Sequence, residues 1–227
     1  RSAYQAGMMF DKGFALHQLG NLALARDCYE RVLKKQPSHF DALHLSGLIA
    51  YEEKKFDKAV SLITQALEIN PQYANAYSHL GNALKELKLY DVALASYDAA
   101  IALNPRNASA YSNRGVVLRD LRRNEDALQS FDKAIEIKDD LTEAFSNRGL
   151  VLKDLNRFEE ALSSFERAIE LDAGFEMAHN NRGLTLQQHG RLQEALSSFD
   201  KAIAIRPDYA EAYWNKSLAL LLDGQLR

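Results

Sequence analysis

Four asparagines recur at equal spacing in the second half of this chain, and their side chains could hold the backbone of a bound peptide. They are Asn113, Asn147, Asn181 and Asn215, each 34 residues after the one before, and we call them the asparagine ladder. A primary amide carries both donors and an acceptor, so it can pair with an extended peptide whatever the sequence of that peptide. The equivalent positions earlier in the chain hold Asp11, Leu45 and His79. We therefore expect the ladder to serve only the C-terminal half.

A second set of side chains at the same spacing could contact acidic groups of a ligand. Lys85, Arg119 and Lys153 recur 34 residues apart, and each is followed by an acid, namely Glu86, Asp120 or Asp154. If each acid neutralises its neighbour, the pattern is only that of a solvated helix face. The ladder amides could likewise bond to side chains of the adjoining unit or to water. With these alternatives open, the candidate peptide contacts are the ladder together with Asn82, Lys85, Arg119 and Lys153.

Three arginines directly follow ladder residues in the run Asn-Arg-Gly. For Arg114, Arg148 and Arg182 we expect the alkyl stem to pack between units while the guanidinium reaches solvent. Binding of an anionic ligand by these arginines is the alternative.

Catalytic and metal-binding patterns are missing from the sequence. None of the six histidines forms a pair at the helical spacing of a zinc motif, and Cys28 is the single cysteine, so thiolates cannot build a metal cluster. The sequence also has neither a glycine-rich phosphate loop nor a Gly-x-Ser-x-Gly elbow. We predict a chain that is not an enzyme and that needs no cofactor and no metal.

Composition limits the classes of partner. The formal net charge is -3, whereas phosphate binding depends on clustered Lys and Arg, so we expect no nucleic-acid partner. No apolar run approaches the roughly 20 residues that span a bilayer, and no signal-peptide pattern opens the sequence. The single cysteine fits a reducing compartment. The expected location is the cytoplasm. Because the chain starts at Arg1 and stops in mid-unit, we expect a piece of a longer protein.

The elements that would position these side chains are repeats of 34 residues. Glycine recurs at 13, 47, 81, 115, 149 and 183, and alanine keeps the same interval at 25, 59, 93, 127, 161 and 195. Counting Ala6 as position one, the complete repeats are 6–39, 40–73, 74–107, 108–141, 142–175 and 176–209, with a partial repeat at 210–227. Ladder residues then occupy position six and the cations position twelve. Such an array places function on the extended surface of a stack of units.

Each repeat reads as two amphipathic helices, because apolar residues fall three, four and seven apart on either side of a short break. The breaks are Gly20-Asn21, Lys54-Lys55, Lys88-Leu89, Arg122-Arg123, Asn156-Arg157, Gly190-Arg191 and Gly224-Gln225. Proline at 37, 71, 105 and 207 separates successive repeats. A glycine inside a helix costs about 1 kcal/mol relative to alanine, so we expect close approach of the two helices at each recurring glycine.

The repeat pattern resembles that of the tetratricopeptide repeat family. The residues that match it within one unit are Tyr77, Leu80, Gly81, Leu84, Ala93, Tyr97, Ala100 and Pro105. The resemblance implies an all-α fold, a right-handed superhelical solenoid of antiparallel helix pairs whose first helices line a concave groove, and a role in holding a protein or peptide.

The asparagine ladder is similar to the one that holds substrate peptide backbones in the superhelix of O-linked N-acetylglucosamine transferases. This resemblance implies that the ladder of this chain clamps a peptide backbone. The leading hypothesis is a non-catalytic scaffold that binds an extended segment. An alternative is a substrate-recruiting arm of a glycosyltransferase-like enzyme, and another is an assembly platform that uses the convex face. Leucines 218, 220, 221 and 222 make the last helix too apolar for a capping helix. A second copy of the chain could cover this helix, which would give a homodimer.

Overall fold

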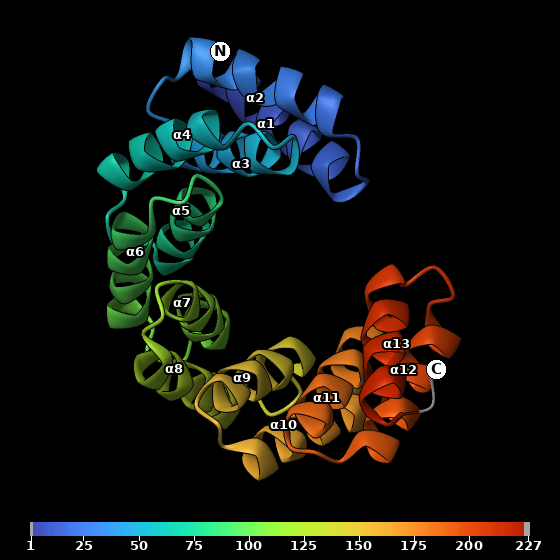
Figure 1. The fold of residues 1–227 in the computed structure, drawn as a ribbon. Helices are drawn as coiled ribbons and strands as arrows, with labels where there is room; N and C mark the ends of the chain where they lie inside the picture. The colour runs from blue at the N-terminus through green and yellow to red at the C-terminus, as the bar shows by residue number, and fades with distance from the viewer. Residues whose placement is uncertain (1, 225–227) are drawn as a thin grey trace. The chain divides into compact units, whose positions relative to one another are not determined.

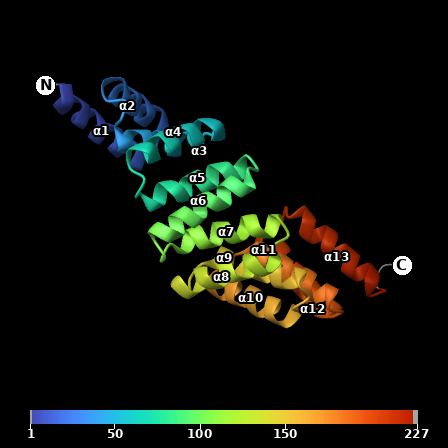
Figure 2. The ribbon, with the colours of Figure 1, turned by 90° about the vertical axis from the view of Figure 1, so that its left-hand side faces the viewer.

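The computed structural model describes residues 2–224, and every regular element in that range is an α-helix (Figures 1 and 2). The helices, in chain order, are α1 (Ser2–Gln18), α2 (Leu22–Lys35), α3 (Phe40–Glu52), α4 (Phe56–Ile69), α5 (Ala74–Glu86), α6 (Tyr90–Leu103), α7 (Ala108–Asp120), α8 (Asn124–Ile137), α9 (Thr142–Asp154), α10 (Phe158–Leu171), α11 (Glu176–Gln188), α12 (Leu192–Ile205) and α13 (Ala210–Leu222). The all-α prediction is confirmed. Odd-numbered helices are the first helices of the repeats, and even-numbered helices are the second helices.

Each helix pair closes through the same turn. One residue in every predicted break has a positive φ: Gly20, Lys54, Lys88, Arg122, Asn156, Gly190 and Gly224, with values between 58° and 79°. At Lys54 the backbone N–H donates to the Tyr51 carbonyl at 2.9 Å, and the N–H of Lys55 reaches back to Ala50 at 2.8 Å. This left-handed C-terminal cap satisfies carbonyls that the first helix leaves open. Gln225, predicted in the last break, lies outside the described residues.

The chain divides into two compact units, residues 1–113 and 114–227, with the boundary inside α7. In the first unit, α3 contacts α4 and α5; in the second, α11 contacts α9, α10, α12 and α13. At these places the first helices of successive repeats touch one another as well as their own second helices, and we call the side that the first helices form in each unit the first-helix face. One continuous array over residues 1–227 stays a prediction.

The recurring glycines mark the closest approach of the two helices of a pair. A Cβ added at Gly115 would lie 2.8 Å from Cζ of Phe131, and one added at Gly183 would lie 2.6 Å from Cε1 of Phe199. Both rings are fully buried. The expected packing reason for a glycine within a helix is therefore confirmed, since any larger residue would have to displace an aromatic ring.

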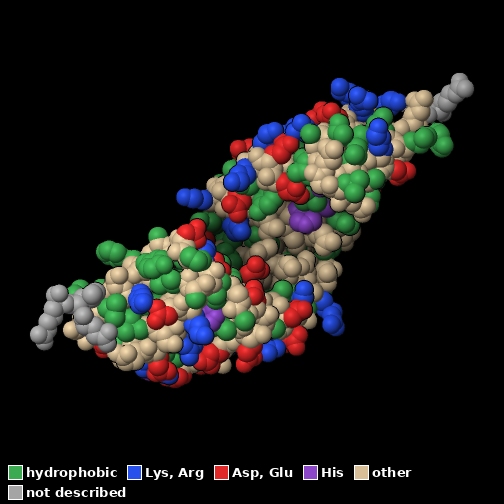
Figure 3. Space-filling view, turned by 90° about the vertical axis from the view of Figure 1, so that its right-hand side faces the viewer, with side chains coloured by type: hydrophobic (Ala, Val, Ile, Leu, Met, Phe, Trp, Pro, Cys, Tyr) green, Lys and Arg blue, Asp and Glu red, His purple; other side chains and the backbone are tan. Residues whose placement is uncertain are grey.

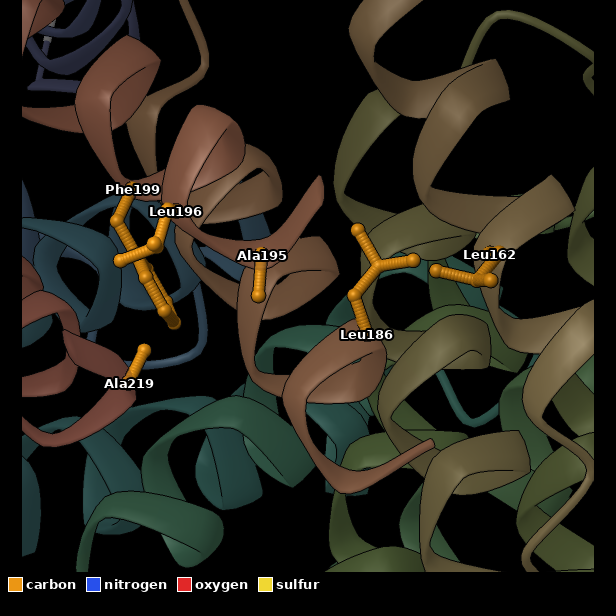
Figure 4. Close-up of a cluster of buried hydrophobic side chains, with 6 residues drawn as sticks. All are labelled: Leu162, Leu186, Ala195, Leu196, Phe199 and Ala219. Carbon is orange, nitrogen blue, oxygen red and sulfur yellow. The ribbon is translucent and has the colours of Figure 1, made fainter. Parts of the chain in front are cut away.

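A cluster of buried side chains in the second unit shows how neighbouring pairs are joined (Figure 4). Leu186 of α11 points toward Leu162 of α10, while Phe199 of α12 points toward Ala219 of α13. Ala195, at the recurring alanine position, lies between them. Each second helix thus packs against the first helix of its own repeat and the first helix of the next, which holds the first helices in line.

Candidate functional site

The structure brings the two predicted sets of contact residues together. In the second unit, the Arg119 guanidinium donates from Nη1 to Oδ1 of Asn147 at 3.0 Å. These residues belong to consecutive first helices and are 28 positions apart in the sequence. Lys153 and Asn181, and likewise Lys85 and Asn113, have the same separation in the sequence. The Arg119–Asn147 bond shows that a side chain at position twelve of one repeat can reach position six of the next.

Asn113 and Asn82 form a hydrogen-bonded pair in the first unit. Nδ2 of Asn113 donates to Oδ1 of Asn82 at 3.0 Å, and the Tyr97 hydroxyl donates to the same oxygen at 2.8 Å. Burial raises the pKa of the Tyr97 hydroxyl, which therefore stays a donor. The Asn82 side-chain oxygen thus accepts one hydrogen bond from Asn113 in the next repeat and one from Tyr97 in the second helix of its own repeat.

Asn215 lies deeper than the other ladder residues. Its side chain is only 8% exposed, and Nδ2 donates to Oδ1 of Asn180 at 3.0 Å. Asn180 is fully buried and donates to Glu211 at 3.3 Å. At this end of the ladder the amide is occupied within the protein, which is the alternative that the sequence left open.

The equivalent contact in the first unit joins two histidines. Nε2 of His44 lies 2.9 Å from Nδ1 of His79, and their rings stack with centroids 5.1 Å apart. Phe40 and Tyr73 enclose His44, with ring centroids at 5.9 and 5.4 Å. Burial, with a smaller effect of the His79 charge, lowers the pKa of His44 to about 4. Burial also lowers the pKa of His79.

Sequence reasoning missed position five. His44 and Asn180 each stand 35 residues before the position-six residue that they contact. The signal was present, because position five is polar in five consecutive repeats, as His44, Ser78, Ser112, Ser146 and Asn180. Polar residues that recur inside an amphipathic helix indicate contacts between repeats.

The position-twelve cations differ in their partners. Lys85 pairs with Glu86 at 3.3 Å, and Arg119 pairs with Asp120 at 3.7 Å, so the neighbouring acids do neutralise these two. Among the salt bridges of the described residues, Lys153 takes part in none, although Asp154 follows it.

The arginines at position seven behave differently from the expectation that their guanidinium groups reach solvent. Arg148 donates through Nε to Asp132 and through Nη1 to the Ser164 hydroxyl, both at 2.6 Å. Arg182 makes the equivalent bonds to Glu166 and Ser198, at 3.1 and 2.7 Å. The serine lies in the second helix of the same repeat and the acid in that of the preceding repeat, so each arginine joins neighbouring units.

The last helix keeps an exposed apolar side. Leu218, Leu221 and Leu222 are 41%, 58% and 59% exposed, and a depression of about 210 Å³ is lined by Trp214, Ser217, Leu218 and Leu221. Leu220, expected to be uncovered with them, instead packs on the cluster around Leu186. Uncovered apolar side chains of this extent on one helix favour contact with another protein surface.

The surface charge, the lengths of the helices and the grouping of metal-binding side chains bear on the other classes of partner. The face drawn in Figure 3 carries basic and acidic side chains interspersed, without an extended patch of one sign. No helix within residues 2–224 combines the length and apolar character that a bilayer crossing needs. Across the same residues, no three His, Cys, Asp or Glu side chains are grouped to hold a metal ion.

Stacked antiparallel helix pairs, with polar side chains repeating along their first helices, define an α-helical repeat protein. The chain belongs to the tetratricopeptide repeat family, whose sequence profile matches residues 10–74, 79–141, 146–210 and 181–226. The superhelical fold class implied by the sequence is that of this family.

Solved structures resemble the chain over most of its length. YrrB, described as a TPR protein with an unusual peptide-binding site, is 26% identical, with a TM-score of 0.68 over 83% of this chain and 97% of that chain. MamA is 25% identical, with a TM-score of 0.67 over 74% and 92%. The pilF protein of Pseudomonas aeruginosa shares the fold, with a TM-score of 0.81 over 96% and 99% at 16% identity. No curated protein matches the sequence.

Proposed function

We propose that this chain is a non-catalytic scaffold that binds an extended peptide or protein segment along the first-helix face of its second unit. The observation that carries the proposal is the meeting of position-twelve and position-six side chains from consecutive repeats, with Arg119 and Asn147 3.0 Å apart. The described peptide-binding site of YrrB, a relative at 26% identity, supports the same use of the fold.

In this proposal the ladder acts as a backbone clamp, the role predicted from its sequence resemblance to the O-linked N-acetylglucosamine transferase superhelix. Asn147 accepts from Arg119 through Oδ1, which leaves the two donors of its amide for peptide carbonyls. Asn113 belongs to the first unit, where it donates one N–H to Asn82, and it is not part of the surface proposed here. Asn215 contributes least, because its amide is buried and bonded to Asn180. Packed helices lie about 8 to 10 Å apart and an extended chain advances about 3.3 Å per residue, so each third peptide residue meets one asparagine.

A peptide array probed with the Asn147→Ala plus Asn181→Ala variant tests this proposal. We expect most peptides bound by the unaltered chain to lose signal, because each lost hydrogen bond contributes about 0.5 to 1.5 kcal/mol. The matched control is Gln129→Ala plus Ser163→Ala, two exposed polar residues of the second helices α8 and α10. Equal signals from the ladder variant and the unaltered chain would remove the clamp from consideration.

We also propose that two copies associate through α13. In the six complete repeats position eight is glycine, since a Cβ there would lie 2.6 to 2.8 Å from a side-chain atom of the second helix. The equivalent residue in α13 is Ser217, whose side chain would hold a following second helix farther from α13 than the second helices lie from the glycines. In the proposed dimer a second copy of the chain covers Trp214 and Leu221. Light scattering at rising concentration should show a dimer that Trp214→Gln plus Leu221→Gln abolishes; a monomer at all concentrations contradicts it.

A further inference from the structure

The ladder has one position at which the asparagine and its neighbouring cation are both unoccupied. Asn113 bonds to Asn82, Asn147 to Arg119, and Asn215 to Asn180. For the side chain of Asn181, by contrast, no hydrogen bond exists within the region that the structure describes, and Thr185 uses only its backbone carbonyl, at 2.9 Å. Lys153, which holds the position in α9 equivalent to that of Arg119 in α7, has neither a hydrogen bond nor an ion pair there.

The difference does not come from a missing acid in the sequence. Asp154 follows Lys153 as Glu86 follows Lys85 and Asp120 follows Arg119. The first two cations pair with these neighbours, at 3.3 and 3.7 Å, while Lys153 does not. Both Lys153 and Asn181 are half-buried on α9 and α11, two helices in direct contact. The Lys153 ammonium, which has no counter-ion among the described residues, can therefore pair with an anion from outside the chain.

We propose that Lys153 and Asn181 together bind the carboxylate of an aspartate or glutamate side chain in the bound peptide. The inference rests on the proposed function and adds the ligand's chemistry. The lysine ammonium offers three donors and the asparagine amide two, a donor set that suits the two oxygens of a carboxylate. Asn181 keeps its oxygen for the N–H of the same or the next peptide residue.

A side-chain carboxylate fits this location better than a peptide C-terminus. In the second unit the Arg119–Asn147 contact lies one repeat before it, and α13 with Asn215 one repeat after it. A peptide that contacts these neighbouring repeats continues in both directions past Lys153. Its terminal carboxylate would then lie elsewhere, and only a side chain could present an anion here.

Pools of nine-residue peptides, acetylated and amidated at their ends, test the inference by fluorescence polarisation. In each pool one position is fixed as Glu, Asp or Gln and the others are randomised; a further set keeps a free C-terminus. For one fixed position we expect the acid pools to bind about two- to fivefold more tightly than the Gln pool, which is the effect of one partly exposed charge pair. Lys153→Met should abolish this preference and Lys153→Arg should retain it. The matched control Lys201→Met removes an exposed lysine of α12 and should change nothing.

The outcomes separate the inference from the function on which it rests. Pools that bind without any preference for acid, or a preference that survives Lys153→Met, would overturn the carboxylate site and leave peptide binding standing. A preference seen only in pools with a free C-terminus would assign the site to a terminal carboxylate and also overturn the proposal. If no pool binds, the proposed function itself fails and the inference fails with it. Equal melting temperatures of the variants, followed by circular dichroism, exclude unfolding as the cause of lost binding.

Discussion

Replacing His44 and His79 together by asparagine should remove a large part of the acid sensitivity of the first unit. His44 is only 5% exposed, and burial first, then the charge of His79, lowers its pKa from 6.5 to about 4. In the unfolded chain the same side chain titrates near 6.5. Between pH 6.5 and pH 4 the unfolded state therefore binds more protons than the folded state. The contribution of the buried histidine to the free energy of unfolding is therefore complete above about pH 7 and is lost as the pH drops through this window.

The size of the effect follows from the two pKa values. At 1.36 kcal/mol for each pH unit, a pKa of about 4 instead of 6.5 corresponds to about 3 kcal/mol lost at pH 4. His79, whose pKa is also lowered by burial, adds to the loss in the same direction. The side chains known to face His44 are the His79, Phe40 and Tyr73 rings. Of these, only the His79 charge contributes to the shift.

Urea unfolding followed by circular dichroism, at pH values from 7.5 to 4, measures this loss. The variant His44→Asn plus His79→Asn imitates the Asn180–Asn215 contact of the second unit, which spans 3.0 Å where the histidines span 2.9 Å. Carboxylates that titrate in the same range are common to both proteins and cancel in the difference. We expect the unaltered chain to lose about 3 kcal/mol more than the variant between pH 7 and pH 4. Parallel pH profiles for the two proteins would show that the buried histidines do not cause the acid sensitivity.

Two further predictions concern stability. Gly115→Leu should cost about 1 to 3 kcal/mol, because a Cβ there already lies 2.8 Å from Phe131; an unchanged melting temperature would contradict the packing. Arg122→Gly should raise the free energy of unfolding by about 0.5 to 1 kcal/mol, because Arg122 has a φ of 61° that glycine adopts freely. Gly190→Ala, at the equivalent turn, should lower the free energy of unfolding in the same urea titration. If both substitutions changed the free energy of unfolding in the same direction, the positive φ would not be the cause.

The helices and their turns could be predicted from the sequence because the 34-residue interval fixes them many times over. Each break reappeared as a turn with a positive φ, even where Lys54 or Arg122 stands in place of glycine. The glycine-to-ring contacts followed from the same repetition. Each repeat is an independent instance of one pattern, so a wrong assignment in one repeat can be recognised by comparison with the others. For this reason the packing within the helix pairs could be predicted from the sequence.

Contacts across repeats were harder to predict, since they depend on which side chains of different helices meet. Position five was overlooked because His44 and Asn180 contact residues 35 positions away rather than 34. The arginines at position seven were expected to reach solvent, but Arg148 finds Asp132 and Ser164 on two different second helices. Lys153 shares the local sequence pattern of Lys85, so the unpaired cation could not be distinguished from the paired one before the structure was known.

The most direct test of the account is to map a bound peptide by ¹⁵N NMR of the side-chain amides. The peptide is one selected on the array for binding to the unaltered chain. If the peptide lies on the first-helix face, the signals of Asn147 and Asn181 shift on titration, while that of Gln129 on the second helix α8 does not. Shifts confined to α8, α10 and α12, with the ladder amides unmoved, would contradict binding on the first-helix face.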